Sequence, residues 1–428
     1  MLRVLHVNQR DPEGFPDLSQ TNGNHMVKFG VIADDLTGAM DTGLQFTRVA
    51  AKAVVSLGPA RRDPGSVLVL DTETRTDSPD TAYSKVRCAA RQLRNRRIYK
   101  KIDSTLRGPI GQELDAVMDE LALERALVTP AFPKSGRTVQ RGQLLVNGSP
   151  LLKTDFASDP LCPPTDDIPR LLAGQSRRSV GHVGLDITTL GAHALVDEIR
   201  QLQAPIVVID AATDHHLCTI AQAAALLGET CLTCGSAGLA GALPAAFDLP
   251  RGPWRAHGQP VTTGAPVLLV VGSLRDATRR QVERARQSRR VSLVELDPLH
   301  LDTSTERALL FADRQLRAGN DVVLTTVFAE FVPGRAGAIS DSLATIAAYL
   351  VRSSPISGLV LTGGAVAVAV CRSLGIHLIE IVDELDPGVP VGRVASGSLR
   401  GTCMVTKAGG FGKDDVLVRA VQYLKGEL

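Results

Sequence analysis

Residues 27–38 read VKFGVIADDLTG, and the order of apolar and acidic residues in this stretch decides the fold. The apolar run from Phe29 to Ala33 predicts a strand that is buried on both faces, as strands of parallel sheets are. Asp34 and Asp35 follow this strand directly. Because ligands of open α/β sheets bind at the carboxyl ends of strands, the two aspartates are candidate site residues.

Two adjacent carboxylates at a strand end are compatible with several functions. They can hold Mg²⁺, accept hydrogen bonds from a polyol or act as a general base. The alternative is structural, because one aspartate can cap the helix that follows. The sequence alone leaves these interpretations open.

Short apolar runs alternate with amphipathic segments along the first half of the chain. The amphipathic segments predict helices over 111–121, 195–202 and 217–227. This alternation is typical of a mostly parallel α/β sheet. The predicted strands that follow the first are 53–57, 66–70, 98–102, 126–129, 180–185, 206–209 and 231–234.

Residues 248–264 interrupt the alternation with a stretch rich in Pro and Gly, which predicts a linker. The alternation then restarts, with strands over 266–271, 291–295, 321–325 and 358–361 and near Ile379 and Met404, and helices over 277–287, 306–318, 339–351, 365–374 and 413–424. We therefore expect two α/β domains with mostly parallel sheets, 26–250 and 263–428, and an active site in the cleft between them. Residues 1–25 are polar and lack periodicity, which predicts a disordered extension.

Composition and charge exclude several classes of function. The 428 residues are 44% hydrophobic and 21% charged, which is ordinary for a folded soluble protein. The net charge is only +2 and aromatic residues make up 4%, so a nucleic-acid-binding surface is not expected. The basic stretch 85–101 predicts a solvated helix face, with nucleic-acid contact as the weaker alternative.

The sequence favours a reduced, cytoplasmic protein. Seven cysteines in a chain of this length do not form a disulfide framework, and Cys231 and Cys234 fall on a predicted strand, which favours a buried structural role. The N-terminus lacks the apolar segment of a signal peptide. The uncharged run 353–371 carries Pro and a Gly-Gly pair, so it does not predict a membrane span.

Polar side chains also follow the third and fourth predicted strands. Arg75 comes shortly after Asp71, and the segment Lys101–Arg107 reads KIDSTLR. Arginine and lysine suit a carboxylate, and Asp103, Ser104 and Thr105 suit hydroxyl groups. Each segment alone is compatible with a surface loop, whereas three strand ends at one sheet edge favour a binding site for a small polar acid.

The second half contributes glycine loops between strands and helices. They lie at Gly272-Ser273, at Gly363-Gly364 and at Ala408–Phe411. Backbone N–H groups at such helix starts bind phosphate, so three loops together predict a nucleotide site. Neither GxxxxGK[ST] nor GxGxxG occurs, which disfavours a P-loop enzyme and an NAD-dependent dehydrogenase. The long insertion 132–160 predicts either a lid or interface arm or a purely structural excursion.

Seven motifs together resemble the four-carbon acid sugar kinase family, previously described as a domain of unknown function. They occur in family order from residue 31 onward and read VIADDLTGAMDTG, LDTETR, KKIDSTLRG, LLVNGSPLLKTDFASDP, VVGSLRDATRRQ, LTGGAVA and VTKAGGFG. The resemblance implies ATP-dependent phosphorylation of the 4-hydroxyl of a four-carbon sugar acid. Among the substrates of the family it favours D-threonate, with D-erythronate and 3-oxo-tetronate as alternatives.

The resemblance also assigns the two sides of the site. It implies that the acid sugar binds to Asp35 with Asp34 beside it, to Arg75 and to Ile102, Asp103, Ser104 and Thr105, and that ATP binds to Ser273, Gly363, Gly364, Ala408, Gly409 and Gly410, next to Phe411. Arg275 is a departure, since relatives often have a small hydroxyl residue at that place.

From these assignments we expect a phosphotransferase that uses ATP and Mg²⁺. Asp35 or Asp34 would be the base, and Arg75 with Lys101 or Arg107 would hold the substrate carboxylate. A sensor that binds the acid without ATP turnover is the alternative from another class. The sequence does not determine the metal ligands or the oligomeric state, and a homodimer is one candidate assembly.

Overall fold

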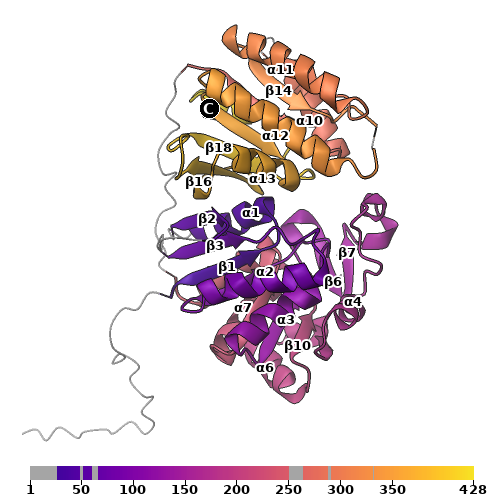
Figure 1. Cartoon of the computed structure of the whole chain (residues 1–428). Helices are drawn as coiled ribbons and strands as arrows, with labels where there is room; N and C mark the ends of the chain where they lie inside the picture. Colours follow the sequence, from indigo (N-terminus) through magenta and orange to yellow (C-terminus); the bar gives the residue numbers. More distant parts are fainter. Residues whose placement is uncertain (1–26, 49–51, 60–65, 250–263, 288–290, 331) are drawn as a thin grey trace, which may run out of the picture.

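The computed structural model describes residues 27–48, 52–59, 66–249, 264–287, 291–330 and 332–428 (Figure 1). The predicted extension 1–25 and all but the ends of the predicted linker 248–264 lie outside the described residues. Within them, the predicted α/β class with mostly parallel strands is confirmed. No helix in this part of the chain is both long enough and apolar enough to cross a membrane.

In the first half, parallel strands pair in the order β2-β3-β1-β4-β11-β5-β10-β9. The strands are β1 (Phe29–Ala33), β2 (Ala53–Leu57), β3 (Val67–Asp71), β4 (Arg97–Lys101), β5 (Arg125–Thr129), β9 (Val180–Val183), β10 (Ile206–Ile209) and β11 (Cys231–Gly235). The helices are α1 (Leu36–Thr47), α2 (Pro79–Gln92), α3 (Ile110–Leu121), α4 (Ile168–Gln175), α5 (Leu185–Thr188), α6 (Ala192–Gln201), α7 (Asp214–Leu227), α8 (Ala237–Ala240) and α9 (Leu243–Ala246). Every residue of β1 is buried, as its apolar run predicts.

In the second half, parallel strands pair in the order β13-β14-β12-β15-β18. They are β12 (Val267–Val271), β13 (Val291–Glu295), β14 (Asp321–Thr325), β15 (Gly358–Thr362) and β18 (Cys403–Lys407). The helices are α10 (Asp276–Arg286), α11 (Leu301–Arg317), α12 (Ala336–Ser353), α13 (Gly364–Ser373) and α14 (Val416–Leu424). Alternate residues of β12 point to two cores: Leu268 and Val270 pack with α11–α13, and Leu269 and Val271 pack with α10 and α14.

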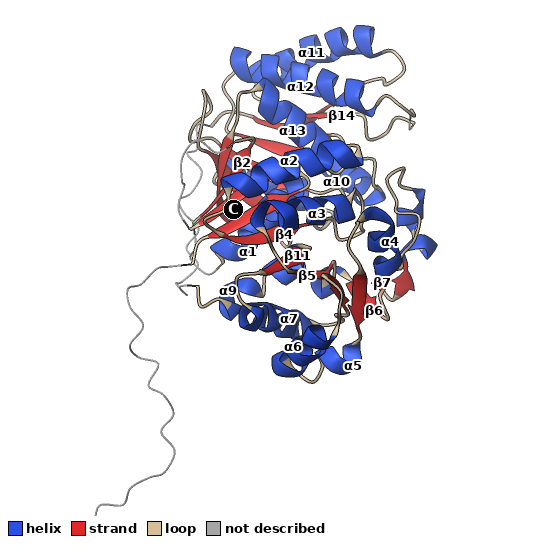
Figure 2. Cartoon of the chain, turned by 60° about the horizontal axis from the view of Figure 1, so that its bottom comes forward, coloured by secondary structure: helices blue, strands red, loops and turns tan. Residues whose placement is uncertain are grey.

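An antiparallel hairpin joins the two halves into one sheet of fifteen strands (Figures 1 and 2). Its strands are β16 (Leu378–Asp386) and β17 (Val389–Val394), and β16 pairs with β2, with Leu378 opposite Ser56. The sequence did not predict β17, because its residues VPVGRV include Pro390 and Gly392, which normally argue against a strand. The hairpin brings α1 of the first half against α13 of the second (Figure 1).

The long insertion after β5 forms a small structure of its own beside the large sheet. It contains η1 (Pro133–Ser135), β6 (Arg137–Gln140), β7 (Gln143–Val146), β8 (Ser149–Pro150), η2 (Leu151–Lys153) and η3 (Asp155–Ser158). The three strands form a separate antiparallel sheet. Its start and its end both reach the cleft described below, through Phe132 and Phe156.

Candidate active site

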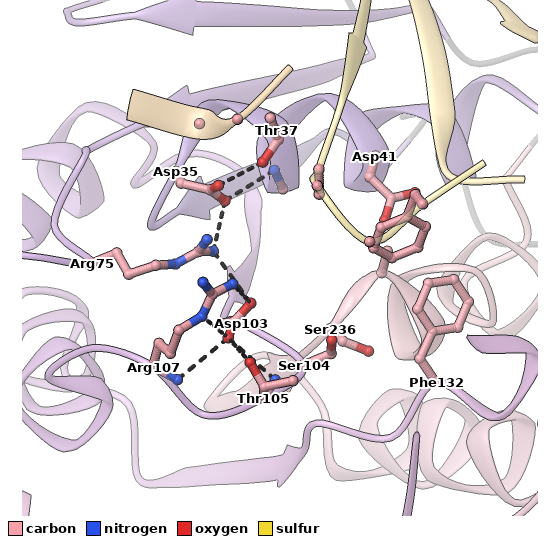
Figure 3. A pocket seen from close by; sticks show the side chains of 18 of the residues that line it. Asp35, Thr37, Asp41, Arg75, Asp103, Ser104, Thr105, Arg107, Phe132 and Ser236 are labelled. Carbon is pink, nitrogen blue, oxygen red and sulfur yellow. Dashed lines mark hydrogen bonds and ion pairs between the residues drawn. The ribbon is translucent and has the colours of Figure 1, made fainter. Parts of the chain in front are cut away.

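A cleft of about 1010 Å³, including its solvent-open part, lies where the two halves meet (Figure 3). The strands that carry its first wall, β3, β1 and β4, are neighbours in the sheet, and so are β12, β15 and β18, which carry the opposite wall. The cleft is lined by the predicted residues Asp35, Arg75, Lys101, Asp103, Ser104, Thr105, Arg107, Ser273, Gly363, Gly364, Ala408, Gly409, Gly410 and Phe411.

Two predicted residues, Asp34 and Ile102, lie beneath the cleft and do not line it. Ile102 is fully buried and packs in the core. Oδ2 of Asp34 accepts a hydrogen bond of 2.7 Å from Nε of Arg75. Burial alone would raise the pKa of Asp34, but the charges of Arg75 and Lys101 hold it below its ordinary value. Asp34 is therefore an ionised structural group rather than a cleft residue.

Asp35 both caps a helix and faces the cleft. As the N-cap of α1 its Oδ1 accepts from the backbone N–H of Gly38 at 3.0 Å, and its Oδ2 accepts from Oγ1 of Thr37 at 2.6 Å (Figure 3). Oδ1 also accepts from Nη2 of Arg75 at 2.7 Å. The capping role and the exposed carboxylate are thus compatible, because a carboxylate offers several acceptor positions.

Oδ2 of Asp35 also faces the start of α13 in the other half. A β-carbon built on Gly364 would lie only 2.8 Å from this oxygen. The first carboxylate of the N-terminal wall thereby approaches backbone N–H groups at a helix N-terminus, which is a position suited to phosphate.

Arg75 and the 103–107 loop form a connected set of ion pairs. Nε and Nη2 of Arg107 donate to the two oxygens of Asp103 at 2.7 and 3.0 Å, and Oγ1 of Thr105 donates to the same carboxylate at 2.5 Å. Burial would raise the pKa of Asp103, but Arg107 and Arg75 hold it well below its ordinary value. Burial would lower the pKa of Arg75. The negative charges of Asp34 and Asp35 outweigh this effect and raise the pKa of Arg75 well above its ordinary value.

The three glycine loops converge on Ser273. A β-carbon on Gly409 would lie 2.0 Å from Oγ of Ser273, and Gly363, which has a positive φ of 93°, places its own missing β-carbon 3.5 Å from the Ser273 nitrogen. Helix α10 holds the third loop in place, since Oγ1 of Thr278 donates to the Gly409 carbonyl at 2.8 Å. A β-carbon built on Gly410 would have no atom within 4 Å, and neither Gly409 nor Gly410 adopts a positive φ.

Several functional candidates were not predicted from the sequence. Lys407, at the end of β18, is almost fully buried, and its Nζ lies 3.4 Å from Oγ1 of Thr278 and 3.5 Å from the Gly409 carbonyl. Burial lowers the pKa of Lys407 to about 7. Asp41 lines the cleft from α1, and burial raises its pKa to about 6. Only their burial in the folded chain distinguishes these residues, and a single sequence does not reveal burial of a charged residue.

The insertion supplies a third wall that the sequence did not predict in detail. Phe132, Arg137 and Phe156 line the cleft. Asp159 then bridges the halves, because its Oδ2 accepts from Nη2 of Arg275 at 2.6 Å and from Nη1 of Arg107 at 3.3 Å. The insertion thus fits the predicted interface arm.

A second cavity of about 690 Å³ adjoins the glycine loops at the carboxyl ends of β12 and β14. It shares Gly363 and Gly364 with the cleft, and its walls include Leu274, Pro298 and Ile339. Its apolar side chains suit the base and ribose of a nucleotide, and the adjacent glycine loops suit the phosphates. In the described residues no cluster of three His, Cys, Asp or Glu side chains suited to a metal ion occurs.

Comparison with known proteins finds a separate family model for each half of the chain. Residues 29–243 match the model of the sugar-binding N-terminal domain, and residues 268–417 match the model of the nucleotide-binding C-terminal domain. The D-threonate kinase of Salmonella typhimurium is 34% identical over 93% of this chain and 99% of its own length. The D-erythronate kinase of Heliobacterium modesticaldum is 34% identical over 92% of this chain and 96% of its own length.

A solved structure shares the fold. The crystal structure of a Salmonella typhimurium LT2 protein, provisionally described as a tRNA synthase, superposes with a TM-score of 0.76. It covers 92% of this chain and 99% of its own, at 24% sequence identity. Together with the two domain matches and the curated relatives, which cover almost the whole chain, the comparisons identify the family: the chain belongs to the four-carbon acid sugar kinases.

Proposed function

We propose that this chain uses ATP to phosphorylate the 4-hydroxyl of a four-carbon sugar acid, and that D-threonate is its substrate. The observation that carries the proposal is the approach of Oδ2 of Asp35 to Gly364 at the start of α13. A hydroxyl bound to Asp35 would face phosphate bound at the glycine loops, which is the arrangement that in-line phosphoryl transfer requires. The choice of D-threonate as substrate rests on two similar relatives that are named D-threonate kinase.

The roles of the first wall follow from its hydrogen bonds. Oδ1 of Asp35 accepts from Gly38 and Arg75, whereas Oδ2, within the described residues, accepts only from the Thr37 hydroxyl. We assign Oδ2 as the atom that accepts the proton of the attacking hydroxyl. Arg75 positions this carboxylate, and Ser104 and Thr105 offer hydroxyl groups to the sugar acid.

The second wall would bind the nucleotide. Ser273, Gly363-Gly364 and the 408–411 loop would hold the phosphates through backbone N–H groups. The adjoining apolar cavity beside Leu274 and Ile339 would take the nucleoside. We further propose that the predicted domains, 26–250 and 263–428, correspond to these two functions, and the family matches to 29–243 and 268–417 support this division.

Mg²⁺ is expected with the nucleotide. A phosphate-bound Mg²⁺ needs only one or two protein carboxylates, the rest of its ligands being phosphate oxygens and water. Asp41, which lines the cleft, fits this need. Among the described residues no arginine or lysine nitrogen lies within 4.0 Å of its carboxylate, whereas the carboxylates of Asp35 and Asp103 are paired with arginines. The ion would neutralise phosphate charge, and Asp41 would hold it on the α1 side of the cleft (Figure 3).

The experiment is a coupled ADP-release assay with D-threonate, D-erythronate and 3-oxo-tetronate as acceptors. Phosphorus NMR of the product then identifies the phosphorylated hydroxyl. The proposal expects ADP release that depends on the acid and a 4-phosphate product, with the highest kcat/KM for D-threonate. Tight binding of an acid without ADP release would instead identify a sensor, and preference for another acid would change the assigned substrate only.

A further inference from the structure

Most of the positive charge in the cleft is already neutralised by carboxylates of the chain itself. Arg75 pairs with Asp34 and Asp35, each at 2.7 Å. Arg107 pairs with Asp103 at 2.7 Å and Arg275 with Asp159 at 2.6 Å, and Nζ of Lys101 lies 3.7 Å from Oδ1 of Asp34. A ligand carboxylate that sought any of these guanidinium groups would have to displace or share an existing partner.

Arg137, the first residue of β6, is different. It lines the same cleft, yet no carboxylate of the described residues lies within 4.0 Å of its guanidinium. Its Nη1 donates to the Ser135 carbonyl, and its buried Nε has no hydrogen-bond partner in the described part of the chain. Burial lowers the pKa of Arg137, but an arginine remains a cation at neutral pH. A half-buried cation with an unsatisfied donor is a site prepared for an anion.

The surroundings of Arg137 hold its guanidinium in place. Its Cζ lies 5.3 Å from the centre of the Phe156 ring, and Cζ of Arg275 lies 4.8 Å from the centre of the same ring. Stacking of this kind orients a guanidinium. Nη2 of Arg137 makes no hydrogen bond within the described residues, so it can donate to an acceptor such as a carboxylate.

The reaction offers two anions, the carboxylate of the acid sugar and the phosphates of the nucleotide. Arg137 belongs to the half that matches the sugar-binding domain, whereas the glycine loops and Arg275 belong to the other half. We propose that Arg137 binds the carboxylate of the acid sugar and so sets the preference for acids over neutral polyols. This inference rests on the proposed function, and it assigns the carboxylate to Arg137 in place of the expected Arg75 with Lys101 or Arg107.

The test compares two acceptors, D-threonate and its neutral primary amide, in the wild type and in Arg137→Gln. Glutamine keeps hydrogen-bonding capacity but removes the charge. For the acid, kcat/KM is expected to fall by ~10–150-fold, the range for loss of a hydrogen bond to a charged group. For the amide it is expected to change by less than ~3-fold, and the KM for ATP is expected to stay the same. The wild-type preference for the acid would therefore largely disappear.

Arg141→Gln serves as the matched control, because Arg141 is an exposed arginine on the same hairpin outside the cleft. Both variants are checked by thermal melting, and acid binding is also measured by calorimetry. An equal loss for acid and amide, or a rise in the KM for ATP, would overturn the inference and assign Arg137 to phosphate. Unchanged acid affinity in folded Arg137→Gln would also overturn it. A wild type that phosphorylates neither acceptor would reject the proposed function instead.

Discussion

Asp35 and Gly364 face each other across the junction of the two halves, so closely that a β-carbon on Gly364 would come within 2.8 Å of Oδ2 of Asp35. Strand β1 and helix α1 set the position of Asp35, and β15 and α13 set that of Gly364. The residues predicted separately at strand ends, some for an acid and some for phosphate, therefore line one cleft.

Asp35→Asn is expected to lower kcat by ~10²–10⁴-fold while the acid sugar still binds. The asparagine oxygen can keep the acceptor role of Oδ1 toward Gly38 and Arg75, and its nitrogen then stands in the place of Oδ2, where it can donate to Thr37. The helix cap is retained, since asparagine caps as well as aspartate. The proposed proton acceptor, Oδ2 facing Gly364, is lost. Steady-state kinetics with both substrates measure the effect.

Asp34→Asn is the contrasting variant. Asp34 is buried and ionised against Arg75, so loss of its charge is expected to lower the melting temperature more than Asp35→Asn does.

If Asp35→Asn raises KM and leaves kcat near normal, Asp35 only positions the hydroxyl. A loose transition state needs little early proton removal, so that outcome is chemically reasonable. The measured kcat of Asp35→Asn decides between a base and a positioning role for Asp35.

Gly409→Ala and Gly410→Ala form a matched pair in one loop. The new methyl group at 409 would lie 2.0 Å from Oγ of Ser273, so we expect both a lower melting temperature and weaker ATP binding. At 410 the methyl group meets no atom within 4 Å, so the melting temperature should not change. Only the approach of phosphate to the backbone would be hindered, which should raise the KM for ATP by ~3–10-fold.

The controls for this pair separate folding from binding. Ser273→Gly combined with Gly409→Ala removes the colliding side chain and should restore the melting temperature. Normal ATP affinity in Gly410→Ala would exclude this part of the loop from the phosphate site. Acid-sugar binding, measured by calorimetry, should remain unchanged in Gly410→Ala.

The strand ends were predictable because sheet geometry brings neighbouring strand ends together. Apolar runs identified β1, β3 and β4, and the residues that follow them line the cleft through Asp35, Arg75 and Asp103. Asp34 and Asp35 were not separable in the sequence. They differ only in the folded chain, where Asp35 caps α1 beside the cleft and Asp34 turns beneath it to Arg75.

Contacts between segments far apart in the chain were not predictable. Asp159 and Arg275 are separated by 116 positions, and neither lies in a periodic segment that predicts its direction. Arg137 begins a short strand inside an insertion of mixed composition, so no pattern assigned it to the cleft. A single sequence indicates which elements form, and long-range pairs of side chains follow only from their packing.

Asp159→Asn is expected to loosen the closed cleft. It weakens the contact to Arg275 and the contact to Arg107, which join the insertion to both halves. These ion pairs are partly exposed, so each stabilises the contact only modestly. We therefore expect a ~3–10-fold rise in the rate of ATP hydrolysis relative to the rate of phosphoryl transfer to the acid. Comparison of ADP release with phosphorylated acid measures this ratio. An unchanged ratio would show that Asp159 does not contribute to closure, and Asp155→Asn, which forms no ion pair in the described residues, is the control.

Lys407 makes the nucleotide half sensitive to pH. Burial lowers its pKa from 10.5 to about 7, and no carboxylate of the described chain lies within 4.0 Å of its Nζ. Between about pH 7 and 10.5 the unfolded chain carries a proton on Lys407 that the folded chain lacks. The unfolded state thus binds more protons, so this residue makes stability rise with pH through that window. In Lys407→Met, the free energy of unfolding measured by urea denaturation should rise less between about pH 7 and 10.5 than it does in the wild type.

Nucleotide binding should reverse the deprotonation of Lys407. Phosphates bound at the 408–410 loop would bring negative charge near Nζ, which lies 3.5 Å from the Gly409 carbonyl. An anion favours the charged form of a lysine, so ATP binding at pH 8 should take up a fraction of a proton. Calorimetry in phosphate and in Tris, whose ionisation enthalpies differ, measures this uptake. Lys413→Met, which removes an exposed lysine from the same loop, should retain it, whereas Lys407→Met should abolish it. Equal binding enthalpies in both buffers for the wild type would mean that the phosphates do not reach Lys407.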